Sequence, residues 1–225
     1  GKLRVQVNIK VDGDHMTMDF DGTKSQTVGP VNAPFPAVVS LARYGYKSLT
    51  VPTAPSIEGH FDQLTIIEPP KGSMFNAQRP AATSLLWPML NALPDLILKA
   101  LAPALPERIR AGHFGDVCAD IVYGQGPDGV EYLLAEPTAG GYGGKPNGED
   151  GEVMFAMTDG DTYNVPAEIR EVRHPIRVVR YELIPDLCGA GKFRGGVGVR
   201  KEYTPVGHDC RLTATFERRL DPGWG

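Results

Sequence analysis

The residues from Glu136 to Gly144 read EPTAGGYGG, and a second glycine cluster, GAGKFRGGVG, runs from Gly189 to Gly198. Glycine is used where the backbone needs a positive φ or where another backbone comes closer than a Cβ permits. Because both clusters lie within strand-like sequence, they predict shaped turns between strands. Neither is a phosphate-binding loop, since that motif ends in Lys-Ser or Lys-Thr at the start of a helix, whereas Lys145 is followed by Pro146.

The order of predicted elements around these clusters indicates an α+β fold. Residues 3–10 alternate polar and apolar and resume at 16–22 after a glycine-containing turn, which predicts a hairpin. Apolar positions with helical spacing predict helices at 34–50 and 84–105. Strands are predicted at 63–67, 117–123, 130–135, 152–157, 168–172, 176–184 and 211–217.

This order lacks the strict strand–helix alternation of a dinucleotide-binding fold. We therefore expect a β-rich chain with mixed or antiparallel sheets and two main helices in its first half. An α+β part is expected at 1–110, with both helices, and a β-rich part at 111–225, with the glycine-rich loops.

The apolar segment at 81–106 is predicted to be a half-buried helix rather than a membrane span. Asn91, Asp95 and Lys99 recur at i, i+4 and i+8, so they form one polar stripe on a helix. We expect this stripe to face solvent. The residues expected to be buried on the other side are Leu90, Leu93, Ile97, Leu101 and Leu105.

Composition narrows the class of protein. A hydrophobic content of 41% indicates a globular chain, and a net charge of -4 argues against a nucleic-acid partner, which requires a basic patch. The three cysteines, Cys118, Cys188 and Cys210, form no CxxC pair, as is typical of reduced intracellular thiols. The first residues read as a strand rather than as a signal peptide. We therefore expect a cytoplasmic protein that binds neither nucleic acid nor membrane.

A series of short motifs is similar, in its order along the chain, to that of the hydantoinase B/5-oxoprolinase family, which also includes subunits of acetone and acetophenone carboxylases. The motifs that carry this resemblance are 19–23, 29–34, 70–76, 79–82, 140–144, 164–168, 180–183, 189–196 and 217–219. Two stretches depart from it: residues 59–63 replace a Gly-Cys-Phe-Arg-Pro pattern, and residues 85–88 replace a polar stretch.

The resemblance implies a subunit of a multisubunit, ATP-dependent enzyme that opens a cyclic amide or imide, such as an N-substituted hydantoin, 5-oxoproline or a lactam. ATP and Mg would bind to a hydantoinase A-like partner subunit, which phosphorylates the carbonyl oxygen, and this subunit would complete the hydrolysis. Full-length members carry a longer N-terminal half, where a divalent metal is expected, so this chain would be a central-to-C-terminal portion.

Three alternatives stay open. The chain could belong to a ketone carboxylase, whose activated species are an enol phosphate and carboxyphosphate. It could be a noncatalytic scaffold that docks the ATP-binding partner. It could also be an unrelated binding module of the sandwich type.

His113 and Asp116 are the candidate catalytic residues. They lie at i and i+3 in the turn Gly-His-Phe-Gly-Asp after the second predicted helix. Loops positioned by a scaffold carry a disproportionate share of functional sites, so this turn is expected to present His113 as a base. The alternative is a loop without a chemical role.

The glycine stretch is the candidate anion site. Backbone N–H groups of Gly140, Gly141, Gly143 and Gly144 would hold a developing oxyanion or a carboxylate, and Arg194 would reach an anionic substrate with its planar guanidinium. Equally, these glycines would serve only a tight loop between strands, and Arg194 would only cap a bulge.

A candidate metal site combines His60 and Asp62, beside Glu58. Their spacing of two would place all three side chains on one face of a strand. A solvated strand face explains the same spacing without a metal.

Overall fold

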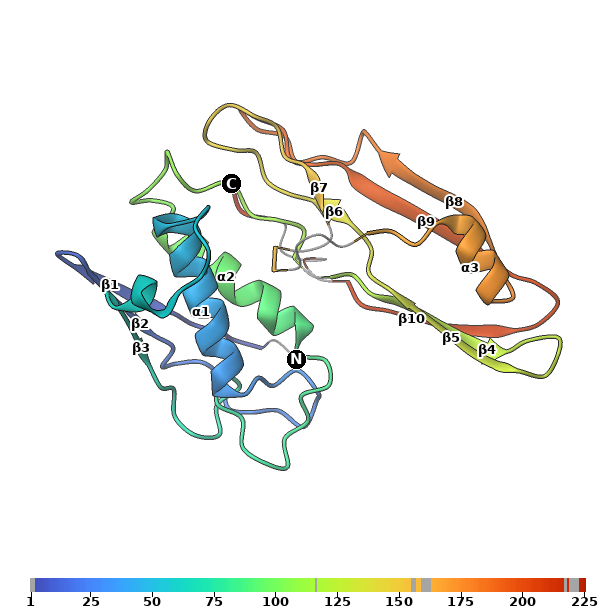
Figure 1. Ribbon diagram of the computed structural model, residues 1–225, viewed down its shortest axis with the longest axis horizontal. Coiled ribbons are helices and arrows are strands. Elements are labelled where there is room, and N and C mark those ends of the chain that lie inside the picture. The colour runs from blue at the N-terminus through green and yellow to red at the C-terminus, as the bar shows by residue number, and fades with distance from the viewer. Residues whose placement is uncertain (1–2, 116, 155–156, 159–162, 217, 219–222) are drawn as a thin grey trace. The chain divides into compact units, whose positions relative to one another are not determined.

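The computed structural model describes residues 3–115, 117–154, 157–158, 163–216, 218 and 223–225 (Figure 1). The predicted α+β class is confirmed, because three α-helices accompany several small antiparallel or mixed sheets within these residues. The chain divides into two compact units, Gly1–Arg110 and Ala111–Gly225.

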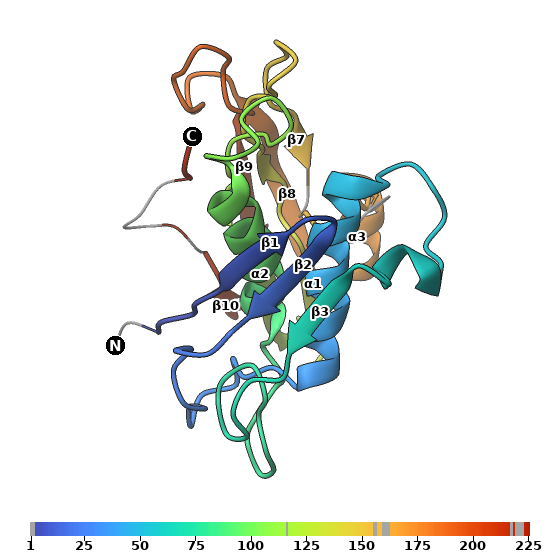
Figure 2. The same ribbon diagram turned by 90° about the vertical axis from the view of Figure 1, so that its left-hand side faces the viewer.

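Unit 1, Gly1–Arg110, is a three-stranded sheet with two helices. The hairpin β1 (Asn8–Asp12) and β2 (His15–Asp19) is antiparallel, and β3 (Leu64–Ile67) joins β2 in parallel. The three strands lie side by side in front of α1 (Phe35–Thr50) and α2 (Trp87–Leu101) in Figure 2. The hairpin and both helices were predicted from apolar periodicity.

The core of unit 1 lies between these helices and the sheet. Gly45 of α1 brings the two helices close, because a Cβ added there would lie 3.3 Å from Ile97 of α2. The rings of Phe20 and Phe75 meet edge to face with centroids 5.7 Å apart. The buried apolar side chains of this core include Met18, Phe20, Val38, Ala42, Met74, Phe75, Leu93 and Ile97.

The prediction that Asn91 and Asp95 face solvent is wrong. Both side chains are buried, and only Lys99 of the predicted polar stripe is exposed. Buried positions occupy most of the circumference of α2, so its polar stripe is covered as well as its apolar side. The Asn91 amide donates to the carbonyl of Trp87, one turn earlier, at 3.3 Å. This bond meets part of its hydrogen-bonding requirement without water.

The described residues of unit 2, Ala111–Gly225, form three sheets. Strands β4 (Asp120–Gln125), β5 (Glu131–Glu136) and β10 (Cys210–Ala214) form an antiparallel sheet in the order β10-β4-β5. Strands β8 (Ile176–Ile184) and β9 (Gly198–Pro205) form a second antiparallel sheet.

Two shorter elements complete unit 2. The strands β6 (Gly140–Gly141) and β7 (Val153–Met154) pair beside the glycine clusters. The helix α3 (Ala167–Arg173) lies against β8 in Figure 1. The strand predicted at 168–172 is therefore wrong, because this segment is helical and begins directly after Pro166, a residue that favours helix entry.

No helix within the described ranges is both long enough and apolar enough to cross a membrane.

Candidate functional site

His113 is almost completely buried in unit 2, with 1% of its surface exposed. Its ring stacks on Tyr142 at a centroid distance of 5.5 Å, and Phe114 contacts it edge on. The Gly115 N–H donates to its Nδ1 at 3.0 Å. In the neutral imidazole the proton therefore sits on Nε2. Asp116, the second predicted catalytic residue, lies outside the described residues.

The structure brings the His113 turn and the glycine stretch together. The Phe114 N–H donates to the Gly141 carbonyl at 3.0 Å. The second glycine cluster joins the same junction, since the Gly196 N–H donates to the Tyr142 carbonyl at 2.6 Å. Three segments that are distant in sequence thus meet through their backbones.

Side chains would not fit at this junction. A Cβ at Gly140 would collide with the Phe114 ring, and one at Gly141 would collide with the Gly196 carbonyl. The same holds for Gly143 against the Ala111 carbonyl. The glycines are thus required for close backbone packing, whichever further role they have. Their role as an anion site stays a prediction.

At Gly144 an added Cβ would lie 3.0 Å from Phe193, the neighbour of Arg194. The backbone N–H of Arg194 donates to the Asp150 carboxylate at 2.8 Å, and its carbonyl accepts from the Gly151 N–H at 2.7 Å. Its side chain is exposed. Its contact with a substrate anion stays a prediction.

The predicted strand face at Glu58, His60 and Asp62 is wrong. Residues Glu58–Phe61 form a 3-10 turn, so the three side chains do not alternate along a strand. Glu58 pairs with Arg43 through oxygen–nitrogen distances of 2.6 and 3.1 Å. Across the described part of the chain, no group of three or more His, Cys, Asp or Glu side chains is placed to hold a metal ion.

A buried charged cluster in unit 2 was not predicted from the sequence. On paired strands β4 and β5, Asp120 lies directly opposite Glu136. Lys201 of β9 places its Nζ 3.2 Å from Asp120 Oδ1 and 3.7 Å from Glu136 Oε2. Arg170 of α3 places its Nε 2.7 Å from Glu136 Oε1. Two carboxylates and two cations thus balance one another away from solvent, where an unpaired charge would be strongly destabilising.

Hydroxyl groups complete the charged cluster. Thr138 donates to Asp120 Oδ1 at 2.6 Å, and Tyr203 donates to Glu136 Oε2 at 3.3 Å. Burial, reinforced by the Asp120 and Glu136 carboxylates, raises the pKa of Tyr203 far above its usual value. Tyr203 is therefore a neutral hydrogen-bond donor at physiological pH.

Two cavities flank this cluster. One has a volume of about 320 Å³, and the polar residues that line it include Asp120, Thr138, Lys201 and Tyr203. The other, of about 190 Å³, is lined by Glu136, Arg170, Arg173 and His174 together with apolar side chains.

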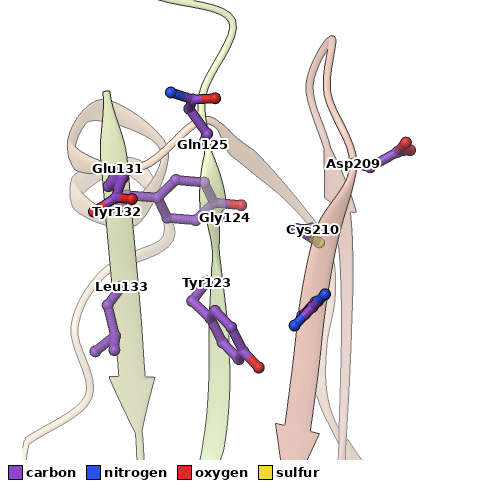
Figure 3. A pocket seen from close by; sticks show the side chains of 9 residues that line it. Tyr123, Gly124, Gln125, Glu131, Tyr132, Leu133, Asp209 and Cys210 are labelled. Carbon is purple, nitrogen blue, oxygen red and sulfur yellow. The ribbon is translucent and has the colours of Figure 1, made fainter. Parts of the chain in front are cut away.

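A wider groove of about 740 Å³ lies over the ends of β5, β4 and β10 (Figure 3). The Tyr132 hydroxyl lies 2.7 Å from His208 Nε2, within hydrogen-bonding distance. Burial and, to a smaller extent, the Cys210 thiol raise the pKa of Tyr132. Tyr132, which lines this groove, thus already has a hydrogen-bond partner outside it.

A sequence signal for the charged cluster did exist. Asp120 and Val122 lie two positions apart on β4, so both side chains lie on the same face of the strand. Because Val122 is buried, Asp120 is on the inward face as well. The two cations could not be assigned to that face. Arg170 lies in the segment predicted as a strand, and Lys201 lies in β9, which was not predicted.

This α+β architecture occurs in two solved enzymes. The ATP-dependent caprolactamase from Pseudomonas jessenii superposes with a TM-score of 0.84 at 24% identity, over 96% of this chain and 38% of that chain. Acetone carboxylase superposes with a TM-score of 0.81 at 18% identity, over 95% of this chain and 29% of that one. Identities this low establish the shared fold alone.

The chain belongs to the Hydantoinase B/oxoprolinase family, which it matches over residues 1–225. The resemblance drawn from the nine motifs is thereby confirmed. The chain is 34% identical, over 90% of its length, to a Pseudomonas sp. (strain NS671) protein named as the B-type subunit of a D-/L-hydantoinase. It is 26% identical, over its full length, to the beta subunit of the caprolactamase from Pseudomonas jessenii. It spans only 35% and 39% of these two relatives.

Proposed function

We propose that this chain forms part of the B-type subunit of an ATP-dependent enzyme that hydrolyses a cyclic amide or imide. The family match along the whole chain carries the proposal, supported by relatives named as a hydantoinase subunit and a caprolactamase subunit. Hydantoins, lactams and 5-oxoproline share an amide carbonyl within a ring. That group defines the proposed substrate class.

An amide carbonyl is a poor electrophile, so the proposed reaction begins with its activation. ATP and Mg²⁺ bind to a hydantoinase A-like partner subunit, where the γ-phosphoryl group is transferred to the carbonyl oxygen. Water then attacks the ring carbon, the C–N bond breaks, and ADP, phosphate and a ring-opened carboxylate leave. The B-type subunit handles the activated intermediate.

Within this chain, the junction of His113 and Gly140–Gly144 is the proposed reaction site. His113 would act as the base, assisted by Asp116, while the glycine backbone and Arg194 would hold the anionic oxygen. The hydrogen bond from Phe114 to Gly141 supports this assignment, because it places the two segments side by side. To accept a proton at Nδ1, His113 must first release the Gly115 N–H.

The test uses the complete subunit that contains this chain, purified with its hydantoinase A-like partner. A panel of 5-oxoproline, hydantoin and caprolactam is incubated with Mg-ATP, and ADP and ring-opened product are measured together. We expect equal amounts of both for one member of the panel, and none without the partner or without ATP. Ring opening that proceeds without ATP would contradict the proposal.

A second measurement tests the division of labour between the subunits. Calorimetric titration of this chain alone with Mg-ATP is expected to show no binding, because its glycine clusters lack the phosphate-loop pattern. Micromolar binding would overturn the assignment of ATP to the partner.

The fold shared with acetone carboxylase favours one further candidate, a ketone carboxylase subunit. The same complex is therefore incubated with acetone, bicarbonate and Mg-ATP. ATP-dependent formation of acetoacetate, with no ring opening in the first panel, would assign the chain to this second activity.

A further inference from the structure

We infer that Tyr142 is a positioning residue, which acts through His113 and fixes the orientation of its imidazole ring. The inference rests on the function proposed above, because it concerns the same junction of His113 and Gly140–Gly144. Tyr142 carries the only side chain in this stretch, which reads Gly-Gly-Tyr-Gly-Gly. Its role is to hold the base, not to react.

The imidazole of a histidine needs neighbours to fix its plane. Rotation about the bond between Cβ and the ring is soft, with two broad minima that differ by a ring flip. In a base, such a flip would move the accepting nitrogen away from the substrate, and a displacement of about 1 Å costs on the order of 100-fold in rate. A fixed ring plane is thus a condition for the proposed role of His113.

Tyr142 provides a flat surface against which the His113 ring lies. The centroids of the two rings are 5.5 Å apart and their planes differ by 24°, so the rings are stacked. Phe114 meets the same imidazole at an angle of 82°, and the Gly115 N–H meets a single ring atom, Nδ1. Of these three contacts, the one with Tyr142 covers a face of the imidazole and therefore restricts its tilt.

Tyr142 is itself held in place through its backbone. Its N–H donates to the Glu152 carbonyl at 2.9 Å, and its carbonyl accepts from the Gly196 N–H at 2.6 Å. Its side chain is buried, as is that of His113, and close packing leaves buried rings little room to move. The ring that supports His113 is thus anchored to the backbone that is proposed to hold the anion.

Tyr142 therefore couples the two halves of the proposed site. The flanking Gly141 and Gly143 could not provide the contact, because a Cβ at either position would collide with a backbone carbonyl, that of Gly196 or Ala111. Since the base leans on a side chain of the glycine stretch, a shift of this stretch would also turn the base.

The kinetic test uses the complete subunit with its hydantoinase A-like partner and the cyclic substrate that it opens. Tyr142→Leu removes the flat surface, whereas Tyr142→Phe keeps it. We expect kcat to fall about tenfold for Tyr142→Leu, with KM little changed, and to recover largely in Tyr142→Phe. Leu134→Ala is the control for lost packing, because Leu134 is buried in a separate core cluster with Val122 and Ile176, and it should leave kcat unchanged.

A double variant separates positioning from a general effect on the fold. If Tyr142 acts through His113, the loss caused by Tyr142→Leu should disappear when His113→Gln is already present, because no base is left to orient. Losses that multiply in the double variant would overturn the inference.

A second readout does not depend on turnover. The chain has five histidines, so in a chain labelled with ¹⁵N-histidine the signals of His113 are those that His113→Gln lacks. In the neutral ring, the wild type should show the proton on Nε2, because Nδ1 accepts the Gly115 N–H. We expect both tautomers in Tyr142→Leu, but only the first in Tyr142→Phe and Leu134→Ala. An unchanged His113 tautomer in Tyr142→Leu would overturn the inference.

The two readouts distinguish failure of this inference from failure of the proposed function. Unchanged turnover in His113→Gln would refute the base role, yet the His113 spectrum of Tyr142→Leu would still decide whether Tyr142 orients the ring. Should Tyr142→Leu not fold, Tyr142→Met replaces it in both measurements, because the longer methionine side chain fills more of the space without offering a flat surface.

Discussion

Asn32 is completely buried in unit 1, and its side-chain amide joins the backbone at 27–29 to that at Ala82. Its Oδ1 accepts from the Thr27 N–H at 2.7 Å. Its Nδ2 donates to the carbonyls of Thr27, Gly29 and Ala82 at 2.9–3.0 Å. This residue belongs to the motif at 29–34 that contributed to the family resemblance. The structure gives that motif a physical reason, because no other uncharged side chain except that of Gln offers both an amide oxygen and an NH₂ group.

Replacing Asn32 should therefore be strongly destabilising. Asn32→Ala leaves one N–H and three carbonyls without this partner, so we expect the free energy of unfolding to fall by about 2–3 kcal/mol. Asn8→Ala, at an exposed position of β1, is the control and should change it by less than about 0.5 kcal/mol. Urea denaturation measures both. Equal small losses would mean that the Asn32 bonds contribute little.

His113 is the residue whose chemical role is most sharply testable. In the reconstituted complex, His113→Gln keeps a hydrogen-bonding side chain but removes the titration, so a base role predicts a fall in turnover of about 100-fold or more. The pH profile of kcat should lose one limb. If turnover and its pH profile stay near those of the wild type, His113 serves packing or donates a hydrogen bond through Nε2, and it is not the base.

At the scale of the elements, the close packing between the two glycine clusters can be tested by adding a methyl group. Gly141→Ala places a methyl group against the Gly196 carbonyl, whereas a Cβ at Gly189 meets nothing within 4 Å. We expect Gly141→Ala to lower the free energy of unfolding by about 1–3 kcal/mol, the range for overpacking. Gly189→Ala, the matched control, should change it little. Urea denaturation of the two variants decides, and similar midpoints would show that the junction yields to a methyl group.

The elements that the sequence predicted well are those with local patterns. Strand β8 occupies the predicted 176–184, and α1 begins within one residue of the predicted helix at 34–50. Segment 168–172 was misassigned because a seven-residue helix spans only two turns. So short a segment does not distinguish a helical period from that of a strand. The prediction that the polar stripe on α2 faces solvent was wrong because tertiary packing covers that side of the helix. The sequence of a single helix does not encode this packing.

At the scale of the whole molecule, the candidate site was only half predictable. His113 and the glycine stretch were each predicted to be site residues, and a backbone hydrogen bond joins their segments. The charged cluster was not expected, since its ion pairs join residues 34 and 81 positions apart. Such contacts depend on how whole sheets and helices assemble, and no local period reports them.

The half-buried Tyr203 links the charged cluster to the alkaline stability of the molecule. Its pKa in the folded chain lies above the unfolded value of about 10. The folded state therefore binds more protons above pH 10, and the stability that is fully present below this pH is lost as the pH rises. Urea midpoints between pH 7 and 11 should fall more steeply for the wild type than for Tyr203→Phe. The control is Tyr163→Phe, at an exposed position, and it should follow the wild type. Parallel slopes for all three chains would contradict this role of Tyr203.

The direct opposition of Asp120 and Glu136 also bears on the order in which unit 2 folds. A hairpin such as β4–β5 closes a short loop and would ordinarily form early. On its own, however, this hairpin places two like charges face to face, an arrangement that is destabilising. The neutralising cations arrive only with α3 and β9, farther along the chain. The hairpin is therefore expected to become stable only when those later elements pack against it. The β-rich half would then fold in one cooperative step rather than strand by strand.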